Sequence, residues 1–115
     1  EGKIIEKFVD ILLEREKNEK KDPILRIRDF KLAVAYFSYE MKRNNYLENK
    51  PMPMMSAEKI MRKAHEKFGF ENPALYTLRI GCELEILIKI DDTIRFFHQS
   101  YFDWFYSHYM RYESS

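Results

Sequence analysis

A change in the spacing of apolar residues after Gly81 limits the fold more than any other feature of this sequence. Between residues 84 and 90, leucine and isoleucine recur at every second position, a period that is typical of a β-strand. Residues 94–96 continue this pattern beyond the acidic pair Asp91-Asp92. The pattern predicts one two-stranded β-hairpin. Apolar residues on both sides of it recur at helical spacing, so the hairpin is expected within a mainly α fold.

An amphipathic helix is predicted over about residues 3–19. Its apolar residues recur at spacings of three and four, and the opposite side is charged. The apolar stripe consists of Ile4, Ile5, Phe8, Ile11 and Leu12. The charged run at 14–22 has no apolar period and is closed by Pro23. It is therefore predicted to be a frayed helix end, a solvated connection and a candidate subdomain boundary.

Three more helices are predicted before the hairpin. Residues 25–45 are apolar on nearly every side in their middle and are expected to form the core helix. A loop is predicted at Pro51-Met-Pro-Met-Met55, because each of the two prolines removes a helical donor. Ser56 is the predicted N-cap of the next helix, which stops at Gly69. Asn72-Pro73 is predicted to cap and start a short fourth helix.

A last helix is predicted from about Gln99 onward, where aromatic residues return to helical spacing. Three helices followed by a two-stranded wing form the winged-helix arrangement. The predicted fold class is therefore mainly α and winged-helix-like, with helices, one two-stranded β-hairpin, and an extra helix before and after.

Composition and charge exclude several classes of function. Twenty Lys and Arg against nineteen Asp and Glu give a net charge of +1, so no overall field would draw the chain to nucleic acid or to an anionic membrane. Cys82 is the only cysteine, which excludes an intramolecular disulfide and a zinc site built from several cysteines. No apolar run approaches the roughly 18 residues of a membrane span, so a cytoplasmic location is predicted.

The chain is not expected to be an enzyme. Glycine occurs only at positions 2, 69 and 81, so no P-loop can be written, and no serine or cysteine is placed as an activated nucleophile. His65 and His108 lack a second histidine three or four residues away, so no metal site is predicted. His65, beside Glu66, is expected to be solvated, and His108 is expected to be a packing residue.

In the segment from Ile94 to Phe105, a histidine lies between the end of a predicted strand and the start of a predicted helix. It resembles the end of the winged-helix subdomain in STAND-class NTPases of the NACHT type, in which a strand with Phe and His precedes an aromatic-acidic-aromatic helix start. The pattern positions are occupied by Phe96, His98, Tyr101, Asp103 and Trp104. The sequence departs from the family at Phe102, where Gln is usual, and at Tyr106-Ser107, where two small residues are usual.

The resemblance implies that residues 1–22 end a preceding helical subdomain, 23–98 form a winged-helix-like domain, and 99–115 start the following helical segment. It also implies that His98 reaches the β-phosphate of ADP, to which an imidazole N–H can donate without the fixed charge of a lysine. ADP and ATP would bind only within a longer parent NTPase, a switch in signalling or defence that could oligomerise. Because the chain begins at Glu1 rather than Met, it is expected to be a piece cut from such a protein.

Half of the aromatic residues of the chain lie between positions 96 and 112. This is more aromatic surface than one face of one helix can bury against so small a partner. Burial by a further helical subdomain or by a partner is therefore predicted, and an ordinary core is the other interpretation. The residues assigned to this interdomain packing are Tyr101, Trp104, Phe105 and Tyr109.

The alternative function is a stand-alone winged-helix module that binds DNA or a protein partner. DNA recognition would need a basic helix in the major groove and a wing that touches the phosphate backbone. The candidate recognition helix, residues 73–82, has only Arg79 as a base, and Asp91-Asp92 at the wing turn would repel phosphate. DNA binding is therefore not favoured, and no membrane partner is expected.

Overall fold

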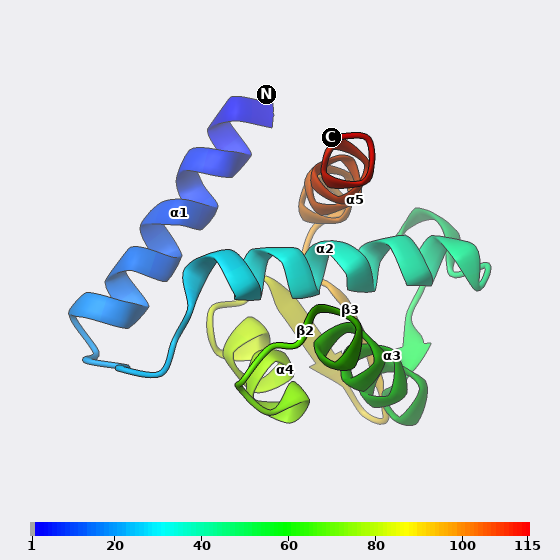
Figure 1. Cartoon of the computed structure of the whole chain (residues 1–115). Coiled ribbons are helices and arrows are strands. Elements are labelled where there is room, and N and C mark those ends of the chain that lie inside the picture. Colours follow the sequence, from blue (N-terminus) through cyan, green and yellow to red (C-terminus); the bar gives the residue numbers. More distant parts are fainter. Residues whose placement is uncertain (1) are drawn as a thin grey trace.

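The second predicted helix runs through the centre of the molecule (Figure 1). In the computed structural model, which describes residues 2–115, this helix is α2, Ile27–Arg43. Ala33, Val34, Ala35 and Phe37 on it have no exposed surface. In Figure 1, α5 lies on one side of α2, and α3 and α4 lie on the other. The prediction that this helix forms the core is confirmed.

The mainly α class is confirmed, and the predicted hairpin forms. The other helices are α1 (Gly2–Asn18), α3 (Met54–Phe68), α4 (Ala74–Glu83) and α5 (Gln99–Glu113), with a short 3-10 turn at Leu47–Asn49. The strands are β1 (Met52–Pro53), β2 (Leu87–Ile90) and β3 (Thr93–Phe96). They form one antiparallel sheet in the order β1-β3-β2, with β2 and β3 as the hairpin.

The structure adds a third strand that the sequence did not predict. β1 lies in the segment 51–55, which was expected to be a loop, and it pairs Met52 with Ile94 and Pro53 with Thr93 of β3. A proline is tolerated in a strand at the edge of a sheet, where its missing N–H has no ladder partner to lose. The two-stranded hairpin is thus part of a three-stranded sheet.

α3 and α4 begin differently from the prediction. α3 starts two residues before Ser56, with Pro53 at the N-cap position, so Ser56 lies inside the helix. α4 has Pro73 at its N-cap position, and the Asn72 side chain donates instead to the Ile24 carbonyl (2.7 Å). Proline costs little there, because the first N–H groups of a helix have no partner within the helix.

The predicted ends of α2 and α3 are confirmed. α2 is followed by Asn44, whose side-chain amide donates to the Glu40 carbonyl (2.7 Å). α3 is followed by Gly69, which has a φ of 69° and donates its N–H to the His65 carbonyl. Glycine adopts this left-handed conformation without the steric cost that a side chain would add.

α1 buries only part of the face that the sequence predicts. Val9 and Leu13 are buried, whereas Ile4, Phe8 and Ile11 are 71%, 48% and 51% exposed. The buried residues are spaced four apart and form one line along the helix. Of the predicted stripe, Ile5 and Leu12 do pack partly against the core, so the prediction holds in part and is wrong for Ile4, Phe8 and Ile11. These three stay largely exposed because α1 stands at the rim of the molecule (Figure 1).

Polar contacts connect α1 and the turn after it to the rest of the chain. Lys31 Nζ on α2 lies 2.7 Å from Asp10 Oδ1 on α1. The Tyr76 hydroxyl on α4 donates to the Asp22 carboxylate (2.6 Å). Both contacts cross the boundary that the sequence places after residue 22.

Aromatic rings form much of the contact between α2 and α5. Tyr36 meets Tyr109 edge-on, with ring centroids 5.5 Å apart. Phe37 packs against Phe96 at 6.1 Å, and Phe96 in turn lies 5.7 Å from Phe105. Tilted and edge-on pairs of this kind are the geometries that aromatic rings prefer. The end of β3 is thereby fixed inside the core, directly before the start of α5.

Candidate functional site

β3 and α5 place His98 at the point where strand becomes helix. The strand ends at Phe96, and the N–H of Phe97 then donates to the Ile86 carbonyl (2.9 Å). His98 keeps an extended backbone, with φ −131° and ψ 148°, and occupies the N-cap position of α5. Its side chain is exposed. The helix begins where the sequence predicts, and His98 stands at its start.

The N-terminus of α5 has no side-chain cap within residues 2–115. The His98 carbonyl accepts the N–H groups of Tyr101 (3.1 Å) and Phe102 (3.4 Å), and the first turn contains no acidic residue. Uncapped N–H groups together with the helix dipole give this end a partial positive charge. The backbone beside His98 therefore favours an anion.

Aromatic side chains flank His98 on the protein side. The Phe97 ring lies edge-on with its centroid 4.9 Å from the imidazole, and the Tyr101 ring lies 6.2 Å away. Phe8 of α1 stacks on Tyr101 at 6.5 Å. Burial, with a smaller contribution from Glu85, raises the pKa of Tyr101, so its hydroxyl stays protonated at neutral pH. An exposed imidazole thus stands against a wall of neutral aromatic rings.

The four aromatic residues assigned to interdomain packing are buried within this chain. They are Tyr101, Trp104, Phe105 and Tyr109, and none is more than 6% exposed. One helix can bury so many rings because α5 contacts both α1 and α2. The premise that these residues need a further subdomain to cover them is therefore wrong. A neighbouring subdomain would have to contact other side chains of α5, such as Met110 and Tyr112, which are exposed.

His65 is buried and hydrogen-bonded, so the prediction that it is solvated is wrong. Its Nδ1 lies 2.6 Å from the Asn72 carbonyl oxygen, and its Nε2 lies 2.8 Å from Thr77 Oγ1. Because a carbonyl oxygen only accepts, Nδ1–H donates to Asn72, and Nε2 accepts from the Thr77 hydroxyl. Burial lowers the pKa of His65. The neutral imidazole joins the end of α3 to α4.

Acidification is expected to destabilise the fold partly through His65. Its pKa is lowered in the folded chain, so as pH falls below about 6.5 the unfolded chain takes up the proton first, which favours unfolding. His65→Asn keeps a donor near the Asn72 carbonyl but does not titrate. Urea unfolding at pH 7 and pH 5 should therefore show a smaller acid-induced loss of stability in the variant. An equal loss in both proteins would contradict this role.

His108 and Cys82 are the two other side chains that could be reactive, and neither is placed or activated for chemistry. His108 stacks on Trp104, with ring centroids 5.0 Å apart and 13° between the planes, in agreement with the predicted packing role. Burial raises the pKa of the Cys82 thiol, so the reactive thiolate is disfavoured. Over residues 2–115, His, Cys, Asp and Glu side chains nowhere gather in a group of three that could hold a metal ion.

Asn49, which the sequence analysis did not single out, fixes the strand that leads to His98. Its side-chain Nδ2 donates to the Phe96 carbonyl and its Oδ1 accepts the Phe96 N–H, both at 2.8 Å. Asn49 has a φ of 62° and is buried. β1 pairs only with Thr93 and Ile94 of β3. At Phe96, the Asn49 side-chain amide makes the two hydrogen bonds that a neighbouring strand would make. The only local signal for this role is that asparagine adopts positive φ more readily than most residues.

Comparison with known proteins finds no match: no family model, no curated protein and no solved structure is similar to this chain. Within the part of the chain that the structure describes, no helix combines the length and the apolar character needed to cross a membrane. Inferences about function therefore rest on the site and on the resemblance of the segment from Ile94 to Phe105.

Proposed function

We propose that this chain is the winged-helix segment of a longer NACHT-like NTPase and that it acts as a latch on bound ADP. The order of elements supports this proposal. α2, α3 and α4 are followed by the β2–β3 hairpin, as in the winged-helix arrangement, with α1 and α5 as the extra helices before and after. The compact core around α2 lets the segment move as one body.

The exposed imidazole of His98 at the uncapped start of α5 is the observation that carries the proposal. A phosphate at this position would receive an imidazole N–H and lie near the positive end of a helix. The fold holds the backbone of His98 firmly, because Phe96 before it is buried and Phe97 is bonded to Ile86. This geometry suits a contact to the β-phosphate of ADP held mainly by another part of the protein.

The latch works through differential affinity. A ligand shifts a conformational equilibrium only to the extent that it binds one state more tightly than the other. In the off state, His98 binds ADP and joins this segment to the nucleotide-binding core. Exchange for ATP removes that contact and releases the segment to rotate as a rigid body. The longer protein would then be active as a signalling or defence switch.

Loss of the imidazole is expected to speed release of ADP from the longer protein. His98→Leu removes one phosphate contact, and a hydrogen bond to a charged group contributes roughly 1.5–3 kcal/mol, so release should accelerate about tenfold or more. The measurement is the dissociation rate of a fluorescent ADP analogue after addition of excess unlabelled nucleotide.

Gln99→Leu is the matched control, because Gln99 is the exposed neighbour of His98 and bonds only locally, to Asp103 (3.0 Å). Release from this variant should be close to that from the native protein. Equal release rates in His98→Leu and the native protein would reject the latch.

A stand-alone module for DNA remains the weaker proposal. Arg79, the one basic residue of α4, is paired with Glu83 at 2.8 Å and lies over the Tyr76 ring. Asp91 and Asp92 at the wing turn are exposed, where they would repel a phosphate backbone. The two proposals make different predictions about the gene that encodes this chain. A latch requires a P-loop encoded upstream, whereas a stand-alone module requires an initiator Met near the start of this chain.

A further inference from the structure

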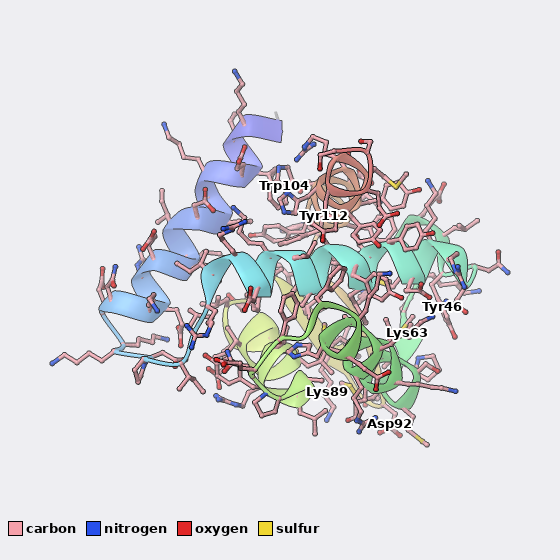
Figure 2. All side chains as sticks on the ribbon, in the orientation of Figure 1. Tyr46, Lys63, Lys89, Asp92, Trp104 and Tyr112 are labelled. Atoms are coloured by element: carbon pink, nitrogen blue, oxygen red, sulfur yellow. The ribbon has the colours of Figure 1, made fainter. Side chains whose placement is uncertain are left out.

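A pocket of about 480 Å³ lies between the start of α2 and the end of α5. Residues from 28–32 of α2 and 108–112 of α5 line it. Trp104 and Tyr112 lie on this side of the molecule, and Asp92 at the wing turn lies on the opposite side (Figure 2). Along α5 the pocket begins about ten residues after His98, or about 15 Å at the rise of an α-helix. It is therefore separate from the candidate site at His98.

Positive charge dominates this pocket. Arg28, Lys31 and Arg111 line it, and Asp29 is the only acidic residue among the lining side chains. Within residues 2–115, neither Arg28 nor Arg111 forms an ion pair, and both are exposed. Both side chains therefore line the pocket without a carboxylate at ion-pair distance. Ten N–H donors, five from each group, are available to an incoming anion.

Lys31 of α2 forms the pocket wall near α1 and α5 as one half of an ion pair. Its side chain is only 15% exposed, because its ammonium group lies 2.7 Å from Asp10 Oδ1 and 5.7 Å from the centroid of the Trp104 ring. These contacts limit its rotamers, so the charge stays where it is instead of moving freely in water. Asp10 offsets the charge of Lys31, so the net positive charge of the pocket comes from Arg28 and Arg111.

His108 on α5 lies close enough to Lys31 and Arg111 for their charges to affect its pKa. It lines the pocket and is half-buried against Trp104. Burial lowers the pKa of His108, and Lys31 and Arg111 lower it further, against a smaller opposing influence of Glu6 and Asp10 on α1. The imidazole is therefore neutral at pH 7, and one of its ring nitrogens can donate a hydrogen bond to an oxygen atom.

We propose that this pocket binds the phosphate group of a small phosphorylated ligand. The forks of Arg28 and Arg111 match the oxygen geometry of phosphate, and the Lys31–Asp10 ion pair forms the wall beside them. The half-exposed ring of Tyr112 at the rim offers a flat surface to the rest of the ligand. This site does not depend on the proposed ADP contact at His98.

Titration of the 115-residue chain with inorganic phosphate tests the site. Two-dimensional NMR spectra at constant ionic strength should show saturable shifts confined to residues near 28–32 and 108–112. Arg28→Gln/Arg111→Gln should weaken binding at least about tenfold, because both charge-assisted forks are lost. Both side chains are exposed, so the variant should fold, and its dispersed spectrum would verify this. Each single variant should show part of the effect.

Lys50→Gln/Lys89→Gln is the matched control, because it removes the same number of charges from exposed positions outside the pocket. This control should bind phosphate like the native chain. Shifts that do not saturate would overturn the proposal. An equal loss of binding in the control and in Arg28→Gln/Arg111→Gln would also overturn it, since it would show that phosphate responds only to net charge.

Discussion

Phe96→Ala is expected to lower the free energy of unfolding by about 3–5 kcal/mol, the usual cost of removing a fully buried Phe ring. Phe96 has no exposed surface. Its ring packs against three others, Phe37 at 6.1 Å and Phe102 and Phe105 at 5.7 Å each. Loss of the ring would leave a cavity where α2, β3 and α5 meet. Domains are commonly stable by about 5–15 kcal/mol, so a large share of the total would be lost.

Chemical denaturation followed by circular dichroism gives this value directly. Phe8→Ala is the control, because it removes the same ring from a position that is 48% exposed. We expect it to cost about 1 kcal/mol or less, since the ring is only partly removed from water. If the two variants lost stability equally, Phe96 would not be the centre of the core.

Asn49→Ala is expected to cost about 2–4 kcal/mol. The side-chain amide bonds both the N–H and the carbonyl of Phe96, and the Phe96 N–H would lose its partner inside the protein. A buried polar group left unpaired costs roughly 1–3 kcal/mol. Alanine at a φ of 62° adds a conformational cost of roughly 1 kcal/mol, because asparagine tolerates this region better.

Asn45 provides a control for the backbone contribution alone. It has a φ of 69° and is exposed, so Asn45→Ala changes the same residue type at a similar backbone angle without breaking a buried pair. Urea unfolding of both variants should give a clearly larger loss for Asn49→Ala. A loss no larger than that of Asn45→Ala would mean that the bonds to Phe96 contribute nothing to stability.

The elements that the sequence predicted correctly depend on local patterns. The alternation after residue 84 and the helical spacing around Phe37 are set by which side chains share one face of one element. Gly69 ends α3 because its φ of 69° is a local requirement. Such features need no knowledge of what packs against them.

The features that were missed depend on partners far away in the chain. β1 is a strand only because β3, some 40 residues later, pairs with Met52. The buried face of α1 is set by where α2 and α5 lie, and the apolar pattern of α1 alone fits several faces. His65 is held in the interior by the Asn72 carbonyl, which accepts its Nδ1–H (2.6 Å), and by the Thr77 hydroxyl, which donates to its Nε2 (2.8 Å). None of these contacts leaves a pattern within a single element.

The sequence predicted where His98 lies along the chain, but not which side chains surround it. A histidine between a strand and a helix start could be located from the segment containing His98. The sequence could not show that Tyr101 and Trp104 would be covered by α1 and α2, because this depends on how three helices pack. The charged pocket at Arg28 and Arg111 was missed for the same reason, since these residues are 83 positions apart and meet only in the fold.

The nucleotide content of the longer protein tests the proposed latch most directly. The protein would be purified from cells and denatured, and the released nucleotide would be separated by anion-exchange chromatography, for the native sequence and for His98→Ala. The latch predicts stoichiometric ADP in the native protein and clearly less in the variant. No bound nucleotide in either protein, or equal ADP in both, would contradict it.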